Sequence, residues 1–90
     1  MISVNLIDVE TYQVHVESAP TREFQVTLRA EDHKRLSGGG CTQEWTIVQA
    51  FHFLLEREPA EAILTRFDLM EVERYFPGFV EDMQERLRDR

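Results

Sequence analysis

The sequence predicts an α+β domain in which an N-terminal antiparallel β-hairpin of two or three strands packs on three to four C-terminal helices. Three observations support this class. Apolar and polar residues alternate with a two-residue period up to about residue 30, which is typical of half-buried strands. From Thr42 onward, apolar residues recur at the helical spacings of three and four. Three consecutive glycines, Gly38, Gly39 and Gly40, separate the two halves.

The ninety residues are expected to form a single domain, with strands in 1–30, a short helix and the glycine loop in 31–41, and helices in 42–90. Because 42% of the residues are hydrophobic, the chain can form a hydrophobic core, but at this length the core must be small. A chain of this size often hides part of its apolar surface in an oligomer, so a homodimer is also expected.

Two apolar rows define the predicted hairpin on either side of a turn at 18–21: Tyr12, Val14 and Val16, and then Phe24, Val26 and Leu28. Nearer the N-terminus, Ile2, Val4 and Leu6 alternate as well, but Ile7 and Val9 fall in the opposite phase. This shift predicts either a bulge around 7–8 or a separate short strand in 2–7. So small a sheet leaves exposed edges, which can pair with a second copy of the chain.

The central element is a predicted helix over residues 42–57, preceded by a short helical turn in 30–36. Its apolar arc is wide, and Trp45 and Phe53 lie outside that arc, which predicts a second layer over them. Pro59 is placed where a new helix begins, so a short helix is expected over 59–67.

Asp68 opens the Asp-Leu-Met-Glu pattern of a capping box, which predicts another helix over 69–76. Pro77 and Gly78 then interrupt the chain before a final amphipathic helix over about 79–88.

Charge and cysteine content exclude several classes of protein. The net charge of −7, from seventeen acidic and ten basic residues, argues against nucleic-acid binding, which depends on Lys and Arg contacts to phosphates. The exception is a weaker hypothesis of an accessory nucleic-acid contact through Arg86, Arg88 and Arg90. Cys41 is the only cysteine, so neither an intrachain disulfide nor a cysteine zinc cage can form within one chain.

The sequence also bears on location. The first ten residues show neither a basic stretch before an apolar run nor a cleavage motif, so no signal peptide is expected. The apolar runs are too short to cross a bilayer. These features predict a cytoplasmic protein without membrane association.

One candidate ligand site combines the glycine loop with neighbouring reactive side chains. Bare amides before a helix can hold an anion, and Cys41 at a helix start can have a lowered thiol pKa, with His33 near enough to reach it. His52 and Glu56, four residues apart, resemble a metal half-site or an acid–base pair. The simpler interpretations are that the glycine loop is a connector, that Cys41 is a small residue at a helix start, and that His52 and Glu56 form a surface ion pair. We therefore expect no catalytic residue, metal or cofactor.

The candidate interaction surface consists of surplus aromatic residues: Trp45, Phe53, Tyr75, Phe76 and Phe79. Aromatic side chains around a Pro-Gly turn suit a docking surface, and they equally suit a core corner between two helices. The sequence thus favours a non-enzymatic interaction or regulatory domain with a protein partner. A small-molecule site at the glycine loop is the alternative function.

The string FLLEREP, followed by FDL and then YFP, resembles a set of small bacterial proteins to which no activity is attached. The likeness is strongest over residues 51–79 and weaker over the strands. It implies a compact bacterial domain and assigns no catalytic residue.

Overall fold

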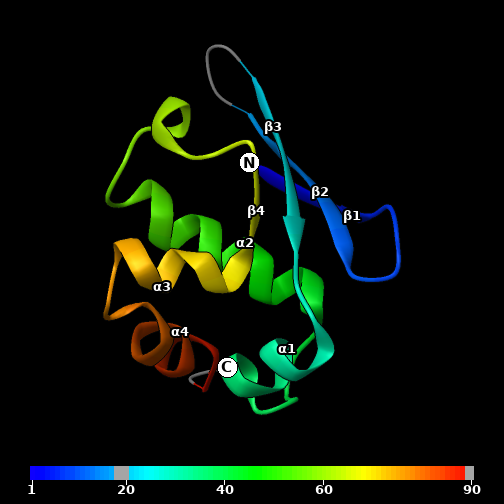
Figure 1. The fold of residues 1–90 in the computed structure, drawn as a ribbon, viewed down its shortest axis with the longest axis vertical. Helices are drawn as coiled ribbons and strands as arrows, with labels where there is room; N and C mark the ends of the chain where they lie inside the picture. Colours follow the sequence, from blue (N-terminus) through cyan, green and yellow to red (C-terminus); the bar gives the residue numbers. More distant parts are fainter. Residues whose placement is uncertain (18–20, 89–90) are drawn as a thin grey trace.

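The computed structural model describes residues 1–17 and 21–88. Its four strands, β1 (Ile2–Leu6), β2 (Thr11–Val16), β3 (Arg22–Thr27) and β4 (Arg66–Asp68), form one sheet in the order β1-β2-β3-β4 (Figure 1). The first three strands are antiparallel neighbours, whereas β4 runs parallel to β3. The predicted α+β class is confirmed.

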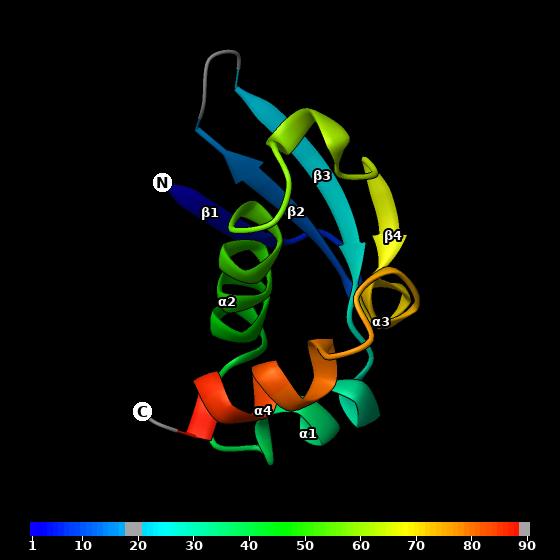
Figure 2. The ribbon, with the colours of Figure 1, turned by 90° about the vertical axis from the view of Figure 1, so that its left-hand side faces the viewer.

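The helices are α1 (Ala30–Ser37), α2 (Gln43–Leu55), α3 (Val72–Tyr75) and α4 (Phe79–Arg88), with short 3-10 segments η1 (Ala60–Ala62) and η2 (Leu69–Glu71). In Figure 2, α2 lies against one side of the sheet, while α1 and α4 lie side by side beyond its end. Helix α4 contacts both α1 and α2, so the C-terminal helix packs against the core through these two helices.

The alternation of the first third sets which face of the sheet is buried. Val14 pairs with Phe24, and both side chains are buried, whereas Gln13 and Glu23 lie on the opposite face and are exposed. β1 is a separate strand that ends at Leu6, and just beyond it the Ile7 and Asp8 N–H groups both donate to the Thr11 carbonyl. The predicted turn at 18–21 lies mostly outside the described residues.

Three of the predicted helices form close to their expected bounds: 30–37, 43–55 and 79–88. Helix α2 begins after Thr42, whose hydroxyl accepts a hydrogen bond from the Trp45 N–H at 3.0 Å. The segment predicted as a helix over 69–76 is a 3-10 turn that continues into the four-residue α3. Asp68 caps it by accepting a hydrogen bond from the Met70 N–H at 2.9 Å.

The helix predicted over 59–67 is wrong, and with it the assignment of 42–90 to helices alone. Only η1 turns, and the chain then extends into β4, where the Gln25 N–H donates to the Thr65 carbonyl at 2.8 Å. Phe67 lies opposite Val26 and its ring centroid is 6.1 Å from that of Phe51. A sheet neighbour therefore outweighs the local helical spacing, because it buries Phe67 and satisfies the β3 backbone.

Candidate interaction site

An open apolar groove of about 270 Å³ lies between the C-terminal end of α2, the η1 segment and α3. We call it the α2–α3 groove. Two large hydrophobic side chains in its lining remain accessible to solvent: Leu64 is 55% exposed and Tyr75 is 67% exposed. The remaining lining residues are Leu54, Glu58, Ala62, Ile63, Phe67, Glu71, Val72 and Phe76. Exposed large hydrophobic side chains that meet in one concavity are typical of a binding site.

The charged lining of this groove is acidic. Glu58 and Glu71 line it, and none of the Lys and Arg side chains that the structure describes does. Neither carboxylate makes an ion pair with any of the described residues. The groove thus combines an apolar surface with unneutralised negative charge.

Local chain geometry turns the two accessible side chains outward. Ile63 ends η1 in an extended conformation, with φ −85° and ψ 135°, so Leu64 is not carried on by a helix into the core. On the other wall, Asp68 caps the turn that leads into α3. Val72 and Tyr75 then begin and end a single helical turn, with Val72 buried and Tyr75 exposed.

The structure corrects the predicted interaction surface at two of its five positions. Phe53 is 2% exposed and Phe79 is 0% exposed, so both belong to the core. Their rings pack edge to face with centroids 5.1 Å apart, and Phe76 meets Phe53 in the same way at 5.9 Å. Phe53 lies under the second layer that its position predicted, formed by α4 and the residues before it.

The three other predicted positions do not share one surface. Tyr75 and the half-buried Phe76 line the α2–α3 groove. Trp45 is 39% exposed, but it lies in the first turn of α2, whereas Leu54 lines the groove from the last turn. At about 1.5 Å of rise per residue, these two turns are more than 10 Å apart along the helix axis. The predicted surface therefore reduces to its Tyr75–Phe76 part.

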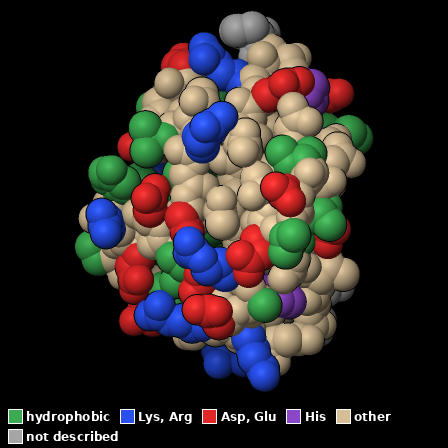
Figure 3. Space-filling model, turned by 45° about the vertical axis from the view of Figure 1, so that its right-hand side comes forward, with side chains coloured by type: hydrophobic (Ala, Val, Ile, Leu, Met, Phe, Trp, Pro, Cys, Tyr) green, Lys and Arg blue, Asp and Glu red, His purple; other side chains and the backbone are tan. Residues whose placement is uncertain are grey.

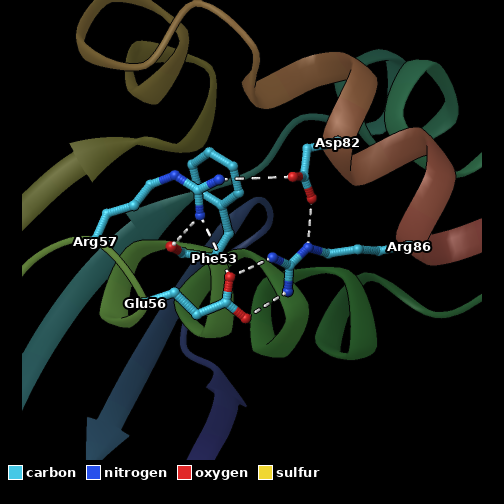
Figure 4. A network of polar contacts seen from close by, with 5 residues as sticks. All are labelled: Phe53, Glu56, Arg57, Asp82 and Arg86. Carbon is cyan, nitrogen blue, oxygen red and sulfur yellow. Dashed lines mark hydrogen bonds and ion pairs between the residues drawn. The ribbon is translucent and has the colours of Figure 1, made fainter.

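A network of four charged side chains covers the Phe53 ring beside α4 (Figure 4). Arg86 binds Glu56 at 2.6 Å through Nη2 and Asp82 at 2.5 Å through Nε. Arg57 reaches the same two carboxylates at 3.3 and 3.7 Å. The hydrogen bond from Arg86 holds the pKa of Glu56 below its ordinary value, and the same bond raises the pKa of Arg86.

This network separates the two residues of the proposed metal half-site. Glu56 is engaged by Arg86 and Arg57, while His52 is exposed on the preceding turn of α2 and forms no ion pair with it. Among residues 1–17 and 21–88, no group of three or more His, Cys, Asp or Glu side chains is placed to hold a metal ion.

The glycine loop mainly terminates α1. Gly38 adopts a left-handed conformation, with φ 70°, and its N–H donates to the Lys34 carbonyl at 2.7 Å. The Gly39 N–H donates to the Ser37 hydroxyl at 2.9 Å, and the Gly40 N–H donates to the Ser37 carbonyl at 3.4 Å. All three amides therefore donate to residues of α1, which leaves none directed at an anion.

His33 does reach Cys41, but not its thiol. The His33 Nε2 atom lies 2.7 Å from the Cys41 carbonyl oxygen, and the Cys41 sulfur lies 3.4 Å from the Thr46 hydroxyl. The imidazole thus fastens the loop to α1 through the backbone. The contact does not form the base–nucleophile pair that thiol chemistry requires.

The basic residues of α4 do not form a free cationic surface. Arg86 is committed to Glu56 and Asp82, Arg88 is exposed, and Arg90 lies outside the described residues. Figure 3 shows acidic and basic side chains interspersed over one face of the molecule, without a continuous basic field.

Comparison with protein-family models, with curated proteins and with solved structures finds no match to this chain. Within the described residues, no helix has the length and apolar character needed to span a membrane. The groove itself was largely missed by sequence reasoning, because Leu64, Glu58 and Glu71 are ordinary helix-face residues when the pattern is read as helical. The one sequence signal of the groove was Pro59, which begins the irregular segment between α2 and β4.

Proposed function

We propose that this chain is a non-enzymatic, cytoplasmic interaction domain that binds a segment of a partner protein in the α2–α3 groove. The observation that carries the proposal is the meeting of Leu64 and Tyr75, both more than half exposed, at one apolar concavity. Because both side chains are already partly buried, covering their exposed parts stabilises a complex by less than the roughly 1.5–3 kcal/mol that full burial of each would give, before the costs of association.

The occupant that fits best is a short amphipathic helix with an apolar face and flanking Lys or Arg residues. An apolar groove between helices receives such a helix through residues spaced one turn apart. Glu58 and Glu71 make no ion pair within residues 1–17 and 21–88, so they favour a basic partner and disfavour an acidic one. The net charge of −7 adds a long-range attraction for the same partner.

The sequence resemblance supports the same location. The shared pattern FLLEREP, FDL and YFP contains five of the lining residues: Leu54, Glu58, Phe67, Tyr75 and Phe76. We therefore extend the proposal to the small bacterial proteins that carry this pattern, which should have the same groove.

A designed peptide tests this proposal directly. A helical peptide of Leu and Lys, with Leu spaced at three and four residues, is titrated against the isotopically labelled chain while backbone amide shifts are recorded. We expect saturable shifts in residues 58–76. Tyr75→Ala and Leu64→Ala should each weaken binding by about tenfold, the equivalent of roughly 1.4 kcal/mol. Replacing the peptide's Lys by Glu should weaken binding as well.

Trp45→Ala supplies the matched control, because it removes an exposed aromatic side chain from the far end of α2. Its affinity for the peptide should equal that of the unsubstituted chain. Equal loss of affinity in Trp45→Ala and Tyr75→Ala would show unspecific hydrophobic adhesion and overturn the proposal. An absence of saturable shifts in residues 58–76 would overturn it as well.

A further inference from the structure

The two edges of the sheet differ in how they are protected. β4, at one edge, has the sequence Arg-Phe-Asp and carries charge at both ends. β1, at the other edge, has the sequence Ile-Ser-Val-Asn-Leu, without a charged residue or proline. Proteins protect free edges with charges, prolines or bulges because an unprotected edge pairs with further strands. β1 therefore has none of these side-chain protections, although α2 contacts this strand.

The backbone groups of β1 that point away from β2 can be assigned. The Ile7 N–H donates to the Thr11 carbonyl, and the Met1 carbonyl accepts from the Glu17 N–H. Because hydrogen-bonded pairs alternate along an antiparallel ladder, the odd-numbered residues of β1 bond to β2. The N–H and C=O groups of Ile2, Val4 and Leu6 therefore point to the open edge. No strand covers that edge in the described part of the chain.

The sequence around this edge reads nearly the same in both directions. Residues 1–7 are Met-Ile-Ser-Val-Asn-Leu-Ile, so apolar and polar positions are symmetric about Val4. In an antiparallel pair of two copies centred on Val4, Ile2 lies opposite Leu6 of the second copy, and Ser3 lies opposite Asn5. Met1 lies opposite Ile7. Every apolar side chain meets an apolar one, and every polar side chain meets a polar one.

The same register uses the free backbone groups. The pairs Val4 with Val4 and Ile2 with Leu6 join residues whose N–H and C=O groups point outward, so each pair can exchange both hydrogen bonds. A register shifted by one residue would bring inward-pointing groups to the interface. A register shifted by two residues would keep outward-pointing groups together but would place Met1 opposite Asn5 or Ser3 opposite Ile7, so the side-chain pattern selects the arrangement centred on Val4.

We propose that the chain forms a two-fold symmetric homodimer by antiparallel pairing of β1 with β1 of a second copy, centred on Val4. The two sheets become one continuous sheet, and the interface is isologous. It covers Met1, Leu6 and Ile7, which are 83%, 55% and 51% exposed in the single chain. This inference concerns the opposite edge of the sheet from β4 and does not depend on the α2–α3 groove.

Sedimentation equilibrium over a range of concentrations gives the first test. We expect the mass to rise from 10.6 kDa toward twice that value as concentration increases. Leu6→Lys should raise the dissociation constant by roughly tenfold or more, because it adds a charge to the edge strand. Val9→Lys is the matched control: Val9 is 84% exposed and lies outside the paired register, so its dissociation constant should be unchanged.

Disulfide trapping tests the register. In a Cys41→Ser background, Ser3→Cys and Asn5→Cys are made as separate chains, since both side chains are exposed on the polar face. Ser3 and Asn5 of the partner form a non-hydrogen-bonded pair, where the two Cα atoms are about 4.5 Å apart and a disulfide can close. We expect a cross-linked dimer in the equimolar mixture and little in either variant alone.

A chain that stays at 10.6 kDa at every soluble concentration would overturn the proposal. A dimer that Leu6→Lys leaves intact, or cross-linking as strong in the single variants as in the mixture, would overturn it as well. Tyr75→Ala should leave the dimer unchanged, so failure of the dimer and failure of the groove are separate results.

Discussion

The guanidinium carbon of Arg57 lies 3.7 Å from the centroid of the Phe53 ring. The Arg86 guanidinium carbon is 5.6 Å from the same centroid, and both arginines are held by Glu56 and Asp82. Phe53 is therefore covered by a charged layer that is itself solvated, with cation–π attraction between ring and cation. This arrangement explains how an aromatic residue outside the apolar arc of α2 becomes 2% exposed.

Substitution of Phe53 should damage stability, whereas substitution of Tyr75 should not. Phe53→Ala removes a ring that packs on Phe76 and Phe79, and we expect a loss of about 3–5 kcal/mol in the free energy of unfolding. Tyr75→Ala removes a side chain that is 67% exposed and should change stability by no more than about 0.5 kcal/mol. Urea denaturation followed by circular dichroism measures both. Equal losses would show that Tyr75 is a core residue.

Acid should weaken the network around Phe53. The pKa of Glu56 is lowered in the folded chain by its hydrogen bond from Arg86, so the unfolded chain binds a proton at this site more readily. The stabilising contribution is complete above the ordinary glutamate pKa and is lost as pH falls through the lower folded value. We expect Glu56→Gln to reduce the dependence of stability on pH in that range, measured by urea denaturation at several pH values.

Glu61→Gln is the control for that titration, since Glu61 is exposed and makes no ion pair with the described residues. It should leave the acid dependence unchanged. If Glu56→Gln and Glu61→Gln gave the same pH profile as the unsubstituted chain, the Arg86 pair would contribute nothing to folding.

The fold could be predicted from the sequence wherever a local pattern was compatible with only one kind of secondary structure. The alternation around Val14 and Val26 and the stripe of α4 each required one kind of element, and these elements form where expected. The segment around Phe67 had two solutions. Its spacing suits a helix, yet β3 offered an open edge about forty residues earlier in the chain, and pairing there satisfies backbone groups that a helix would leave exposed.

The candidate site was harder to predict for the same reason. Tyr75 and Phe76 were identified as aromatic surplus, and both line the groove. Phe53 and Phe79 belong to the same surplus, but Phe53 is covered by Arg57 and by Arg86 of α4, and Phe79 packs against the Phe53 ring. Leu64 lies in the segment 59–67, where the predicted helix does not form. Contacts between elements distant in sequence therefore decided which aromatic side chains remain exposed.

Asp68 should contribute more to the stability of the chain than its exposure suggests. Its carboxylate accepts a hydrogen bond from the Met70 N–H and also binds the Arg29 guanidinium, which joins the end of β4 to the start of α1. Asp68→Ala should destabilise the chain by about 1–2 kcal/mol, because it removes an N-cap. Asp68→Asn keeps a capping oxygen and loses only the charge, so its loss should be about half as large or less. Thermal unfolding of the three chains distinguishes these cases, and equal melting temperatures would contradict the capping role.

Gly38 and Gly40 offer a matched pair for the function of the glycine loop. Gly38→Ala forces a Cβ onto a residue at φ 70°, and we expect a cost of about 1–2 kcal/mol although, apart from the adjoining backbone, no described atom lies within 4 Å of the added carbon. Gly40 has no positive φ, and its nearest neighbour to an added Cβ is the Ser37 carbonyl at 3.8 Å, an ordinary contact. Gly40→Ala should therefore be neutral or slightly stabilising, since it restricts the unfolded chain. Urea denaturation measures the difference, and equal effects of the two substitutions would mean that the left-handed turn does not limit the stability of α1.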